Sequence, residues 1–311
     1  MDVEVSPDTR KPDVLVAEPV DVLLPFYGDV AQFRQAVDSV LSQSYGDFTL
    51  ICVDDCYPSF EPRDWLLSLK DPRVRYVRNE VNLGVARNFN RCLELASAPR
   101  FVMIGGDDVM LADYLETVMR IAGRHPDAVV IQPGVEVIDE AGRPVRPLPD
   151  RIKAMIRPRV DGAERVLRGE QLAVSLTRAD WAYFPSLLWS TQAARRHGFD
   201  EQYAIALDLA LLLDLALDGG ALVITDDVCF RYRRHSSSVS SAGADDGIRF
   251  AQERALLDDY AARFSRVGWN AAAGVARRKF IPRLSAGSSA LSAALAGRPR
   301  DSWRLLRYVF G

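Results

Sequence analysis

The sequence predicts an α/β fold in which a mostly parallel central sheet is flanked by helices. Short apolar segments alternate with amphipathic, helix-like segments from residue 20 to residue 131, as in strand–helix repeats. The apolar segments lack the period-2 alternation of half-exposed strands, which is typical of strands covered on both faces. A chain of 311 residues with 48% hydrophobic and 26% charged residues is globular in composition, which excludes a disordered or collagen-like protein.

Strands are expected where the apolar segments are rich in Val, Ile, Leu and Phe. The first runs from Val20 to Leu24 and is expected to stop at Pro25. Others are expected at 48–53, 74–77, 101–104, 128–131, 187–189, 223–224 and 228–232. Ligands bind beyond the carboxyl ends of parallel strands, so the loops after the first four strands are the expected location of the chemistry.

Helices are expected where apolar residues recur every three or four positions. Asp29 suits the N-cap of a helix whose apolar residues between Val30 and Leu41 form one stripe. Residues 143–159 are rich in Arg and Pro and weakly periodic, which predicts a long loop, and only helical patterns follow residue 241. Further helices are expected at 65–69, 85–96, 111–122 and 206–217.

Three parts are predicted along the chain: a loose leader at 1–19, one α/β domain at 20–240 and a C-terminal helical region at 241–311. The leader lacks the basic start and apolar run of a signal peptide, and no segment of 18 apolar residues occurs. Four scattered cysteines do not form a disulfide framework. We therefore expect a cytoplasmic protein, either soluble or peripheral at the inner face of the membrane.

The charge is unevenly distributed. Residues 261–311 carry ten Arg and Lys against the single Asp301, a net +9, which leaves −12 for the first 260 residues. Arginines beside Trp303 and Phe310 could rest on anionic lipid, or the helices could pack on the α/β domain with the arginines in water. Packing is the favoured interpretation. Nucleic acid is the weakest candidate partner, because most of the chain is acidic.

Two carboxylates, Asp54 and Asp55, follow the second expected strand. They could accept hydrogen bonds from a base or a ribose, or they could form a solvated turn. After the first strand the chain reads Pro25-Phe26-Tyr27-Gly28, without the glycines that admit a pyrophosphate. This disfavours a dinucleotide-binding Rossmann site, and no Walker A sequence is present.

A glycine and an arginine follow the third expected strand. Gly84 permits a tight turn into the next helix, and Arg87 near the start of that helix could meet a phosphate. The alternative is a capping turn with a surface arginine.

Two glycines and two carboxylates follow the fourth expected strand, in the order Gly105-Gly106-Asp107-Asp108. The glycines let a ligand approach the backbone, and hard oxygen ligands suit Mg²⁺ or Mn²⁺ bridged to phosphates. The alternative is an acidic helix cap. The metal interpretation is favoured, because Asp107 is not needed for capping.

Asp208 and Asp214 interrupt a leucine-rich helix, and a spacing of six residues places them on different sides. Burial among apolar residues would raise the pKa of Asp208, as a general base requires, whereas a surface position would leave it solvated. His235 lies in a serine-rich segment. It would be a metal ligand only beside a second ligand, and otherwise a polar surface residue.

In this order the segments resemble the family 2 glycosyltransferases of the GT-A fold, over residues 20–240. The resemblance depends on the motifs Pro25-Phe26-Tyr27, Ser39-Val40-Leu41-Ser42-Gln43, Val53-Asp54-Asp55, Asn82-Leu83-Gly84 with Arg87-Asn88, Asp107-Asp108, Gly198-Phe199-Asp200-Glu201, Asp208 and Tyr232-Arg233-X-His235-X-X-Ser238-X-Ser240. It implies an inverting transfer of a sugar from a UDP-, GDP- or dTDP-linked donor to an unidentified hydroxyl acceptor.

The resemblance also implies residue roles. Asp54 or Asp55 would contact the base and Arg87 the diphosphate. Asp208 would be the catalytic base. The implied donor-binding residues are Pro25, Tyr27, Asp54, Asp55, Asn82, Gly84, Arg87, Asn88, Gly106, Asp107 and Asp108. The implied ligands of Mg²⁺ or Mn²⁺ are Asp107, Asp108 and His235.

The motifs depart from the family pattern at three places. Gly105 occupies the position of the first acid of Asp-X-Asp, Gly28 replaces an asparagine, and Ala206-Leu207 lacks the glutamate that precedes the base. These departures favour one alternative, a non-catalytic nucleotide-sugar-binding protein. A sugar-phosphate nucleotidyltransferase would need a glycine-rich basic loop after the first strand, which is absent, and the missing Gln-X-X-Arg-Trp sequence argues against a processive synthase.

Overall fold

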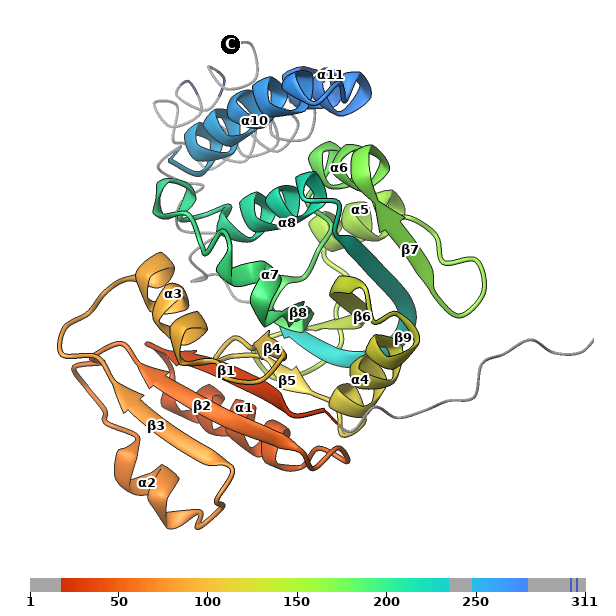
Figure 1. Cartoon of the computed structure of the whole chain (residues 1–311). Helices are drawn as coiled ribbons and strands as arrows, with labels where there is room; N and C mark the ends of the chain where they lie inside the picture. The colour runs from red at the N-terminus through yellow and green to blue at the C-terminus, as the bar shows by residue number, and fades with distance from the viewer. Residues whose placement is uncertain (1–17, 235–247, 279–302, 304–305, 307–311) are drawn as a thin grey trace, which may run out of the picture.

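The computed structural model describes residues 18–234, 248–278, 303 and 306 (Figure 1). At its centre is a nine-stranded sheet in the order β3-β2-β1-β4-β8-β6-β9-β5, with β7 beside β9. The strands are β1 (Val20–Phe26), β2 (Phe48–Asp54), β3 (Val74–Arg78), β4 (Arg100–Met103), β5 (Val109–Met110), β6 (Ala128–Ile138), β7 (Arg165–Arg168), β8 (Leu188–Ser190) and β9 (Ala221–Arg233).

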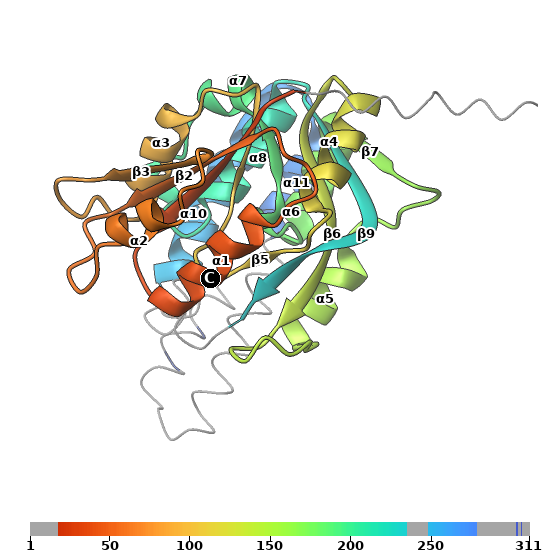
Figure 2. The same cartoon turned by 90° about the horizontal axis from the view of Figure 1, so that it is seen from below.

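Helices surround this sheet (Figures 1 and 2). They are α1 (Val30–Leu41), α2 (Arg63–Ser68), α3 (Val85–Leu95), α4 (Tyr114–Arg124), α5 (Leu148–Ile156), α6 (Gly169–Arg178), α7 (Thr191–Arg195), α8 (Leu207–Leu217), α10 (Ile248–Arg266) and α11 (Asn270–Arg278). Two short 3₁₀ turns, η1 (Phe184–Ser186) and η2 (Glu201–Tyr203), precede β8 and α8. Asp29 caps α1 as predicted, since its side chain accepts a hydrogen bond of 2.8 Å from the Gln32 amide.

The sheet is mostly parallel, as predicted. β3, β2, β1 and β4 are parallel neighbours, and β6 and β9 pair in parallel over nine registered positions. Each of the four antiparallel pairings joins only two to four positions. The carboxyl ends of the first four strands therefore lie at one edge of the sheet.

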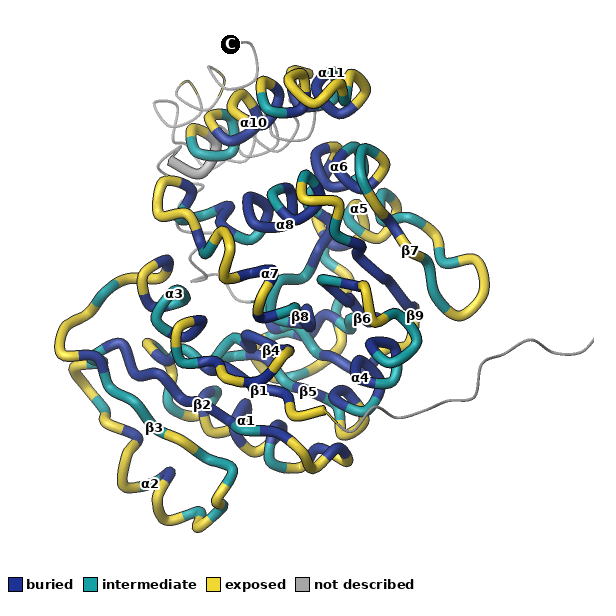
Figure 3. Tube along the Cα trace, viewed as in Figure 1, coloured by how far each residue is buried: buried dark blue, intermediate teal, exposed yellow. Residues whose placement is uncertain are grey.

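Both faces of the central strands are covered, which explains their continuous apolar runs. Leu23 and Met103 belong to one core cluster, which includes residues of α3, α7 and α8. The residues beside them in sequence, Val22 and Val102, belong to a second cluster with α1 and α4 on the opposite face. The strands are accordingly among the most buried segments (Figure 3).

Helices α10 and α11 pack on the sheet-covering layer, as favoured for the C-terminal region, of which residues 279–302, 304–305 and 307–311 lie outside the described part. Leu256, Tyr260 and Phe264 of α10 are at most 1% exposed. The Tyr260 hydroxyl donates to the Ala210 carbonyl and to Asp214 on α8, each at 2.8 Å. Arg263 pairs with the same Asp214 at 2.5 Å. Among the described residues, no helix is long and apolar enough to cross a membrane.

Three expectations about elements were wrong in detail. β1 continues through Pro25 to Phe26. The Leu23 carbonyl accepts a hydrogen bond from the Ile104 amide on the β4 side of the strand. Pro25 is two residues later, so its nitrogen faces the same side. Pairing between β1 and β4 has ended at Leu23. The missing amide therefore leaves no gap in the sheet. The strands expected at 223–224 and 228–232 are parts of one strand, β9, whose pairing with β6 shifts register near Gly134.

The third difference is α5, which forms within the predicted loop at 143–159. Pro149 lies in its first turn, a position that proline tolerates. Most of the apolar residues of α5 face outward, whereas Asp150 and Lys153 face the protein. The sequence analysis did not assign β5, β7, α6 or α7.

Candidate active site

The motif residues lie at the carboxyl edge of β3, β2, β1 and β4. These four strands are adjacent and parallel, so the residues that follow them must lie side by side. The sequence analysis placed the chemistry in these loops.

Asp54 is an anchor inside the protein. Its carboxylate is fully buried, accepts a 2.8 Å hydrogen bond from the Tyr76 hydroxyl and pairs with Arg78 at 2.6 Å. The Tyr57 amide donates to its other oxygen at 2.8 Å. Asp54 therefore joins the ends of β2 and β3.

Asp55 holds the loop that leads into α3. One carboxylate oxygen accepts from Asn79 and from the Leu83 amide, each at 2.8 Å, and the other accepts from the Gly84 amide at 3.0 Å. Asn79 also donates to Asn88 at 2.9 Å, and both amide side chains are buried. Gly84 has φ +78°, in the left-handed region that glycine adopts most readily. The loop from residue 79 to residue 84 is therefore fixed before any ligand binds.

Three further predicted site residues lie at or near this edge. The Asn82 side chain accepts from the Gly84 amide at 2.9 Å. Arg87 is 65% exposed and donates to Glu201 at 2.7 Å, which connects α3 to η2. Tyr27 is 55% exposed, and its ring meets the edge of Tyr57 at 5.1 Å. Exposed rings of this kind could stack on a base.

The segment Gly105–Asp108 forms a compact loop that we call the acid loop. A Cβ atom on Gly105 would lie 2.6 Å from Oδ2 of Asp108 and 2.8 Å from Oδ1 of Asp107. The two carboxylates therefore converge on the space where a side chain at 105 would be, and a larger residue there would have to displace them. At Gly106 a Cβ atom would meet nothing closer than the Pro25 carbonyl at 3.7 Å.

Arg233, at the end of β9, holds the acid loop in place. Its amide donates to Oδ1 of Asp108 at 2.8 Å, and its Nε donates to the Asp107 carbonyl at 2.7 Å. Its remaining nitrogens reach the Asp139 and Glu140 carbonyls and Gln35, each at 3.1 Å. The sequence motif contained Arg233 but assigned it no role.

The acid loop fits a divalent cation. Oδ2 of Asp108 and Oδ1 of Asp107 point to one space, and burial together with the charge of Asp107 raises the pKa of Asp108 well above its usual range. A cation would relieve both effects. The described residues contain no group of three or more His, Cys, Asp and Glu side chains that could hold a metal. His235, the third predicted ligand, lies outside the described residues.

Asp208 lies in the first turn of α8 and is partly buried. Burial raises the pKa of its carboxyl group to about 7, and the negative charge of Asp180 acts in the same direction. The charge of Lys153 and backbone hydrogen bonding oppose the rise. Oδ1 of Asp180 is buried and has no hydrogen-bond partner among the described residues. Asp214 faces α10 instead, so the two acids of this helix lie on different sides, as predicted.

A series of contacts and charge interactions connects Asp208 to the acid loop. The Lys153 ammonium, whose charge acts on Asp208, donates to the Ala182 carbonyl at 3.1 Å and lies 5.1 Å from the centre of the Tyr183 ring. Tyr183 packs on Tyr232 with ring centres 5.3 Å apart. Burial raises the pKa of Tyr232, and the charges of Asp108 and Asp107 raise it further. The sequence analysis missed Lys153, Asp180 and Tyr183, which come from the segment where it found no motif.

The family follows from comparison with known proteins. A family model described as "Glycosyl transferase family 2" matches residues 21–187, more than half of the chain. The chain belongs to glycosyltransferase family 2. The match includes β1 to β4 and the acid loop and ends before Asp208.

Relatives of this glycosyltransferase family include curated bacterial proteins. The putative colanic acid biosynthesis glycosyl transferase WcaA of Escherichia coli K12 is 31% identical over 90 residues, 29% of this chain and 32% of that protein. The putative glycosyltransferase EpsE of Bacillus subtilis 168 is 29% identical over 134 residues, 42% of this chain and 48% of that protein. The chain thus spans less than half the length of these relatives.

Solved structures show the same fold. S. aureus TarS residues 1–349 in complex with UDP-GlcNAc matches with a TM-score of 0.60 at 13% identity, over 93% of this chain and 90% of that chain. The same region of TarS with UDP gives a TM-score of 0.56. The likeness confirms the predicted GT-A fold.

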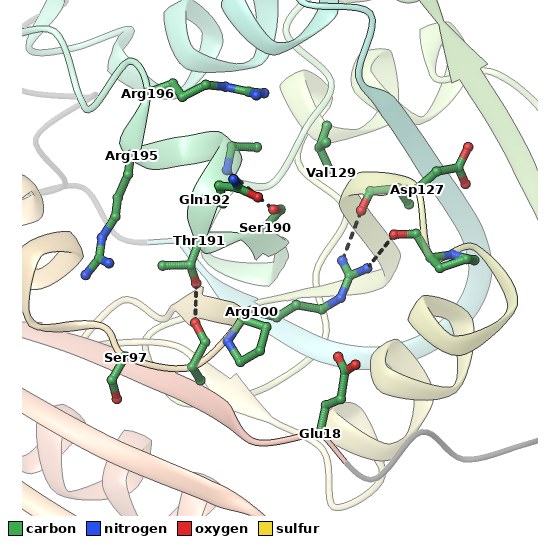
Figure 4. Close-up of a pocket in the computed structure, with 15 residues that line it drawn as sticks. Glu18, Ser97, Arg100, Asp127, Val129, Ser190, Thr191, Gln192, Arg195 and Arg196 are labelled. Atoms are coloured by element: carbon green, nitrogen blue, oxygen red, sulfur yellow. Dashed lines mark hydrogen bonds between the residues drawn. The ribbon is translucent and has the colours of Figure 1, made fainter.

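A pocket of about 780 Å³ lies at the other end of the sheet from the family motifs (Figure 4). It is lined at the amino-terminal ends of β4 and β6 and at the start of α7. Buried Arg100 donates there to the Ala128 carbonyl at 3.0 Å and to the Pro126 carbonyl at 3.4 Å. Its role is to connect β4 to the turn before β6, and the pocket takes no part in the candidate site.

Proposed function

We propose that this protein is an inverting, metal-assisted glycosyltransferase that uses a nucleotide-diphosphate sugar. The single observation that supports it most is the series of contacts and charge interactions between Asp208, whose pKa is near neutrality, and the converging carboxylates of the acid loop. Such a transfer needs a base that deprotonates the acceptor and a group that binds the donor diphosphate. The proposal assigns the transfer to residues 20–240 of a cytoplasmic or peripheral protein.

The donor is proposed to lie along the edge formed by β3, β2, β1 and β4. The exposed ring of Tyr27 and the loop held by Asp55 would receive the nucleoside, and Arg87 would exchange Glu201 for the diphosphate. UDP-, GDP- and dTDP-sugars all fit this arrangement. UDP-sugars are the first to test, because the similar TarS structure contains UDP-GlcNAc.

Asp107 and Asp108 are proposed to hold Mg²⁺ or Mn²⁺, with His235 as a further ligand. The cation would neutralise charge on the departing nucleoside diphosphate. Arg233 would hold the Asp108 carboxylate and the backbone of Asp107 in place through the contacts described above. Gly105 is consistent with this role, because the two aspartates occupy the space of a side chain at that position.

Asp208 is proposed to act as the general base. Its carboxylate would take the proton of an acceptor hydroxyl, whose oxygen forms a bond to the anomeric carbon. The bond from that carbon to the diphosphate oxygen breaks, and the electron pair leaves with the nucleoside diphosphate. A base with a pKa near 7 suits proton removal at neutral pH.

The decisive experiment compares Asp208→Asn with Asp214→Asn, which changes the other acid of α8. Turnover would be measured with a panel of UDP-sugars, sugar acceptors and Mn²⁺, and donor binding by thermal shift. We expect Asp208→Asn to bind donor normally and lose about 10²-fold or more in turnover, while Asp214→Asn stays active. Equal turnover by Asp208→Asn and the unmodified protein would contradict the proposal, and donor binding without transfer would support a non-catalytic binding protein.

A further inference from the structure

Helix α5 has its polar side facing the protein. The Asp150 side chain is 5% exposed, pairs with Arg234 at 2.6 Å and accepts from the Tyr183 hydroxyl at 3.0 Å. Lys153, one turn later, donates to the Ala182 carbonyl at 3.1 Å. At about 100° per residue these two side chains lie within roughly 60° of each other around the helix. The buried side of α5 is therefore ionic.

The opposite side of α5 is apolar and faces solvent. Leu148, Ile152 and Met155 are 66%, 39% and 82% exposed. Their spacing of four and three residues places them on one stripe of the helix. A surface helix ordinarily buries its apolar stripe, so α5 is the reverse of the usual arrangement. In Figure 2 it lies at the periphery of the molecule, beyond the body of the sheet.

Cations surround the apolar stripe. Residues 143–159 contain five arginines and Lys153 against one acid, Asp150, a net charge of +5. Arg146, Arg151 and Arg159 are exposed and form no ion pair with a described residue. Arg143 and Arg157 pair with Asp139 and Asp226, which lie outside this segment, so Arg146, Arg151 and Arg159 are the arginines available to a partner.

We propose that α5 docks on the surface of an anionic lipid bilayer. Leu148, Ile152 and Met155 insert among the lipid head groups, and the flanking arginines contact lipid phosphates. A lipid surface fits better than a protein partner, because a stable protein interface buries roughly 800 Å² on each side, and three side chains on a nine-residue helix offer only part of that area.

Docking through α5 would also orient the candidate site. The inner side of the helix contacts Tyr183 and Arg234, and the charge of Lys153 acts on Asp208. A bilayer held against the outer side would therefore lie across α5 from the side chains that interact with the proposed base. The proposal does not depend on the proposed transfer, because lipid binding can be measured without donor or acceptor.

The test is co-sedimentation of the full chain with vesicles of 40 mol% phosphatidylglycerol in phosphatidylcholine. Two double variants are compared. Ile152→Ser with Met155→Ser removes apolar side chains of the stripe, and Arg146→Gln with Arg151→Gln removes flanking positive charges. Two controls change matched residues elsewhere, Leu67→Ser on α2 (68% exposed) and Arg91→Gln on α3 (side chain 42% exposed). We expect binding to fall about tenfold or more in each α5 variant and to stay unchanged in the controls, with all melting temperatures alike.

Three results would overturn the proposal. The unmodified protein could fail to bind these vesicles, or both α5 variants could bind as tightly as it does, which would place any lipid contact elsewhere, including the basic C-terminal region. Light scattering could instead show a dimer that the Ile152→Ser, Met155→Ser variant dissociates, in which case the apolar stripe contacts a second copy of the chain. Loss of binding in the α5 variants with turnover unaffected in solution would support docking independently of catalysis.

Discussion

Asp208 works beside a second carboxylate, that of Asp180. A negative charge nearby favours the protonated form of Asp208, and burial acts in the same direction. A buried carboxylate oxygen without a hydrogen bond, such as Oδ1 of Asp180, costs free energy. In the proposed mechanism this arrangement gives the base a proton affinity near that of an imidazole.

The first residue-scale prediction concerns Asp180→Asn. The base is active only when ionised, so turnover should fall as pH drops below about 7 in the unmodified protein. Removing the charge at 180 should lower the pKa of Asp208 and move this acid limb to lower pH. The measurement is turnover against pH at saturating donor. An acid limb that does not move would show that Asp180 does not act on the base.

The second residue-scale prediction concerns the acid loop. Gly105→Asp restores the Asp-X-Asp pattern in sequence, yet its Cβ would lie 2.6 Å from Asp108. We expect a loss of about 1–3 kcal/mol in unfolding free energy from overpacking, together with a weaker response to Mn²⁺. Gly106→Ala is the matched control, because its Cβ meets nothing closer than 3.7 Å. A stronger metal response in Gly105→Asp would contradict the steric explanation.

At the scale of elements, β9 carries Arg233 from the far side of the sheet to the acid loop. Arg233→Lys keeps the charge and the backbone hydrogen bond to Asp108 but loses the guanidinium contacts to three carbonyls and Gln35. We expect half-maximal activity to need several-fold more Mn²⁺. Arg231→Lys, two residues earlier and paired with Glu136 at 2.9 Å, is the control. If both variants need the same Mn²⁺ concentration for half-maximal activity, the guanidinium of Arg233 does not hold the acid loop in place for metal binding.

The elements also show which local patterns were informative. The apolar runs of β1 and β2 predicted strands covered on both faces, and the parallel pairing followed from their alternation with helices. α5 was missed because the prolines at 144, 147, 149 and 158 indicated a loop, although Leu148, Ile152 and Met155 have helical spacing. β5 was missed because two residues, Val109 and Met110, are too short a segment to form a pattern.

At the scale of the whole molecule, the ionisation of Asp208 affects stability. Its folded pKa is near 7, above the usual carboxyl value of 3.8, so ionising it disfavours the folded state. The unmodified protein should lose stability as pH rises from about 4 through 7, because Asp208 ionises over this range. Asp208→Asn does not ionise and should not show this loss. Asp208→Asn should therefore have a higher melting temperature than the unmodified protein at pH 8, by about 2–4 °C for each kcal/mol of stability. At pH 4 the two melting temperatures should be nearly equal. An identical difference at both pH values would contradict the raised pKa.

The sequence predicted the part of the site that follows neighbouring parallel strands, but not the part that tertiary packing brings together. Asp55, Gly84 and Asp107 follow neighbouring parallel strands, so their meeting at one edge was predictable from the fold class alone. That Asp54 is buried as an anchor was not predictable, because adjacent acids look alike in sequence. Asp180 and Lys153 act on Asp208 only through tertiary packing, which leaves no local pattern.

The attachment of α10 to α8 limits how this protein can be shortened. Helix α8 is apolar on nearly every side, and the Tyr260 hydroxyl and Arg263 of α10 contact it at Ala210 and Asp214. A recombinant version cut after residue 240, at the predicted domain boundary, would leave leucines of α8 in contact with water and the helix of the base unsupported. Swapping tails between homologues would meet the same obstacle, so the transferase core and its tail are expected to evolve as one unit.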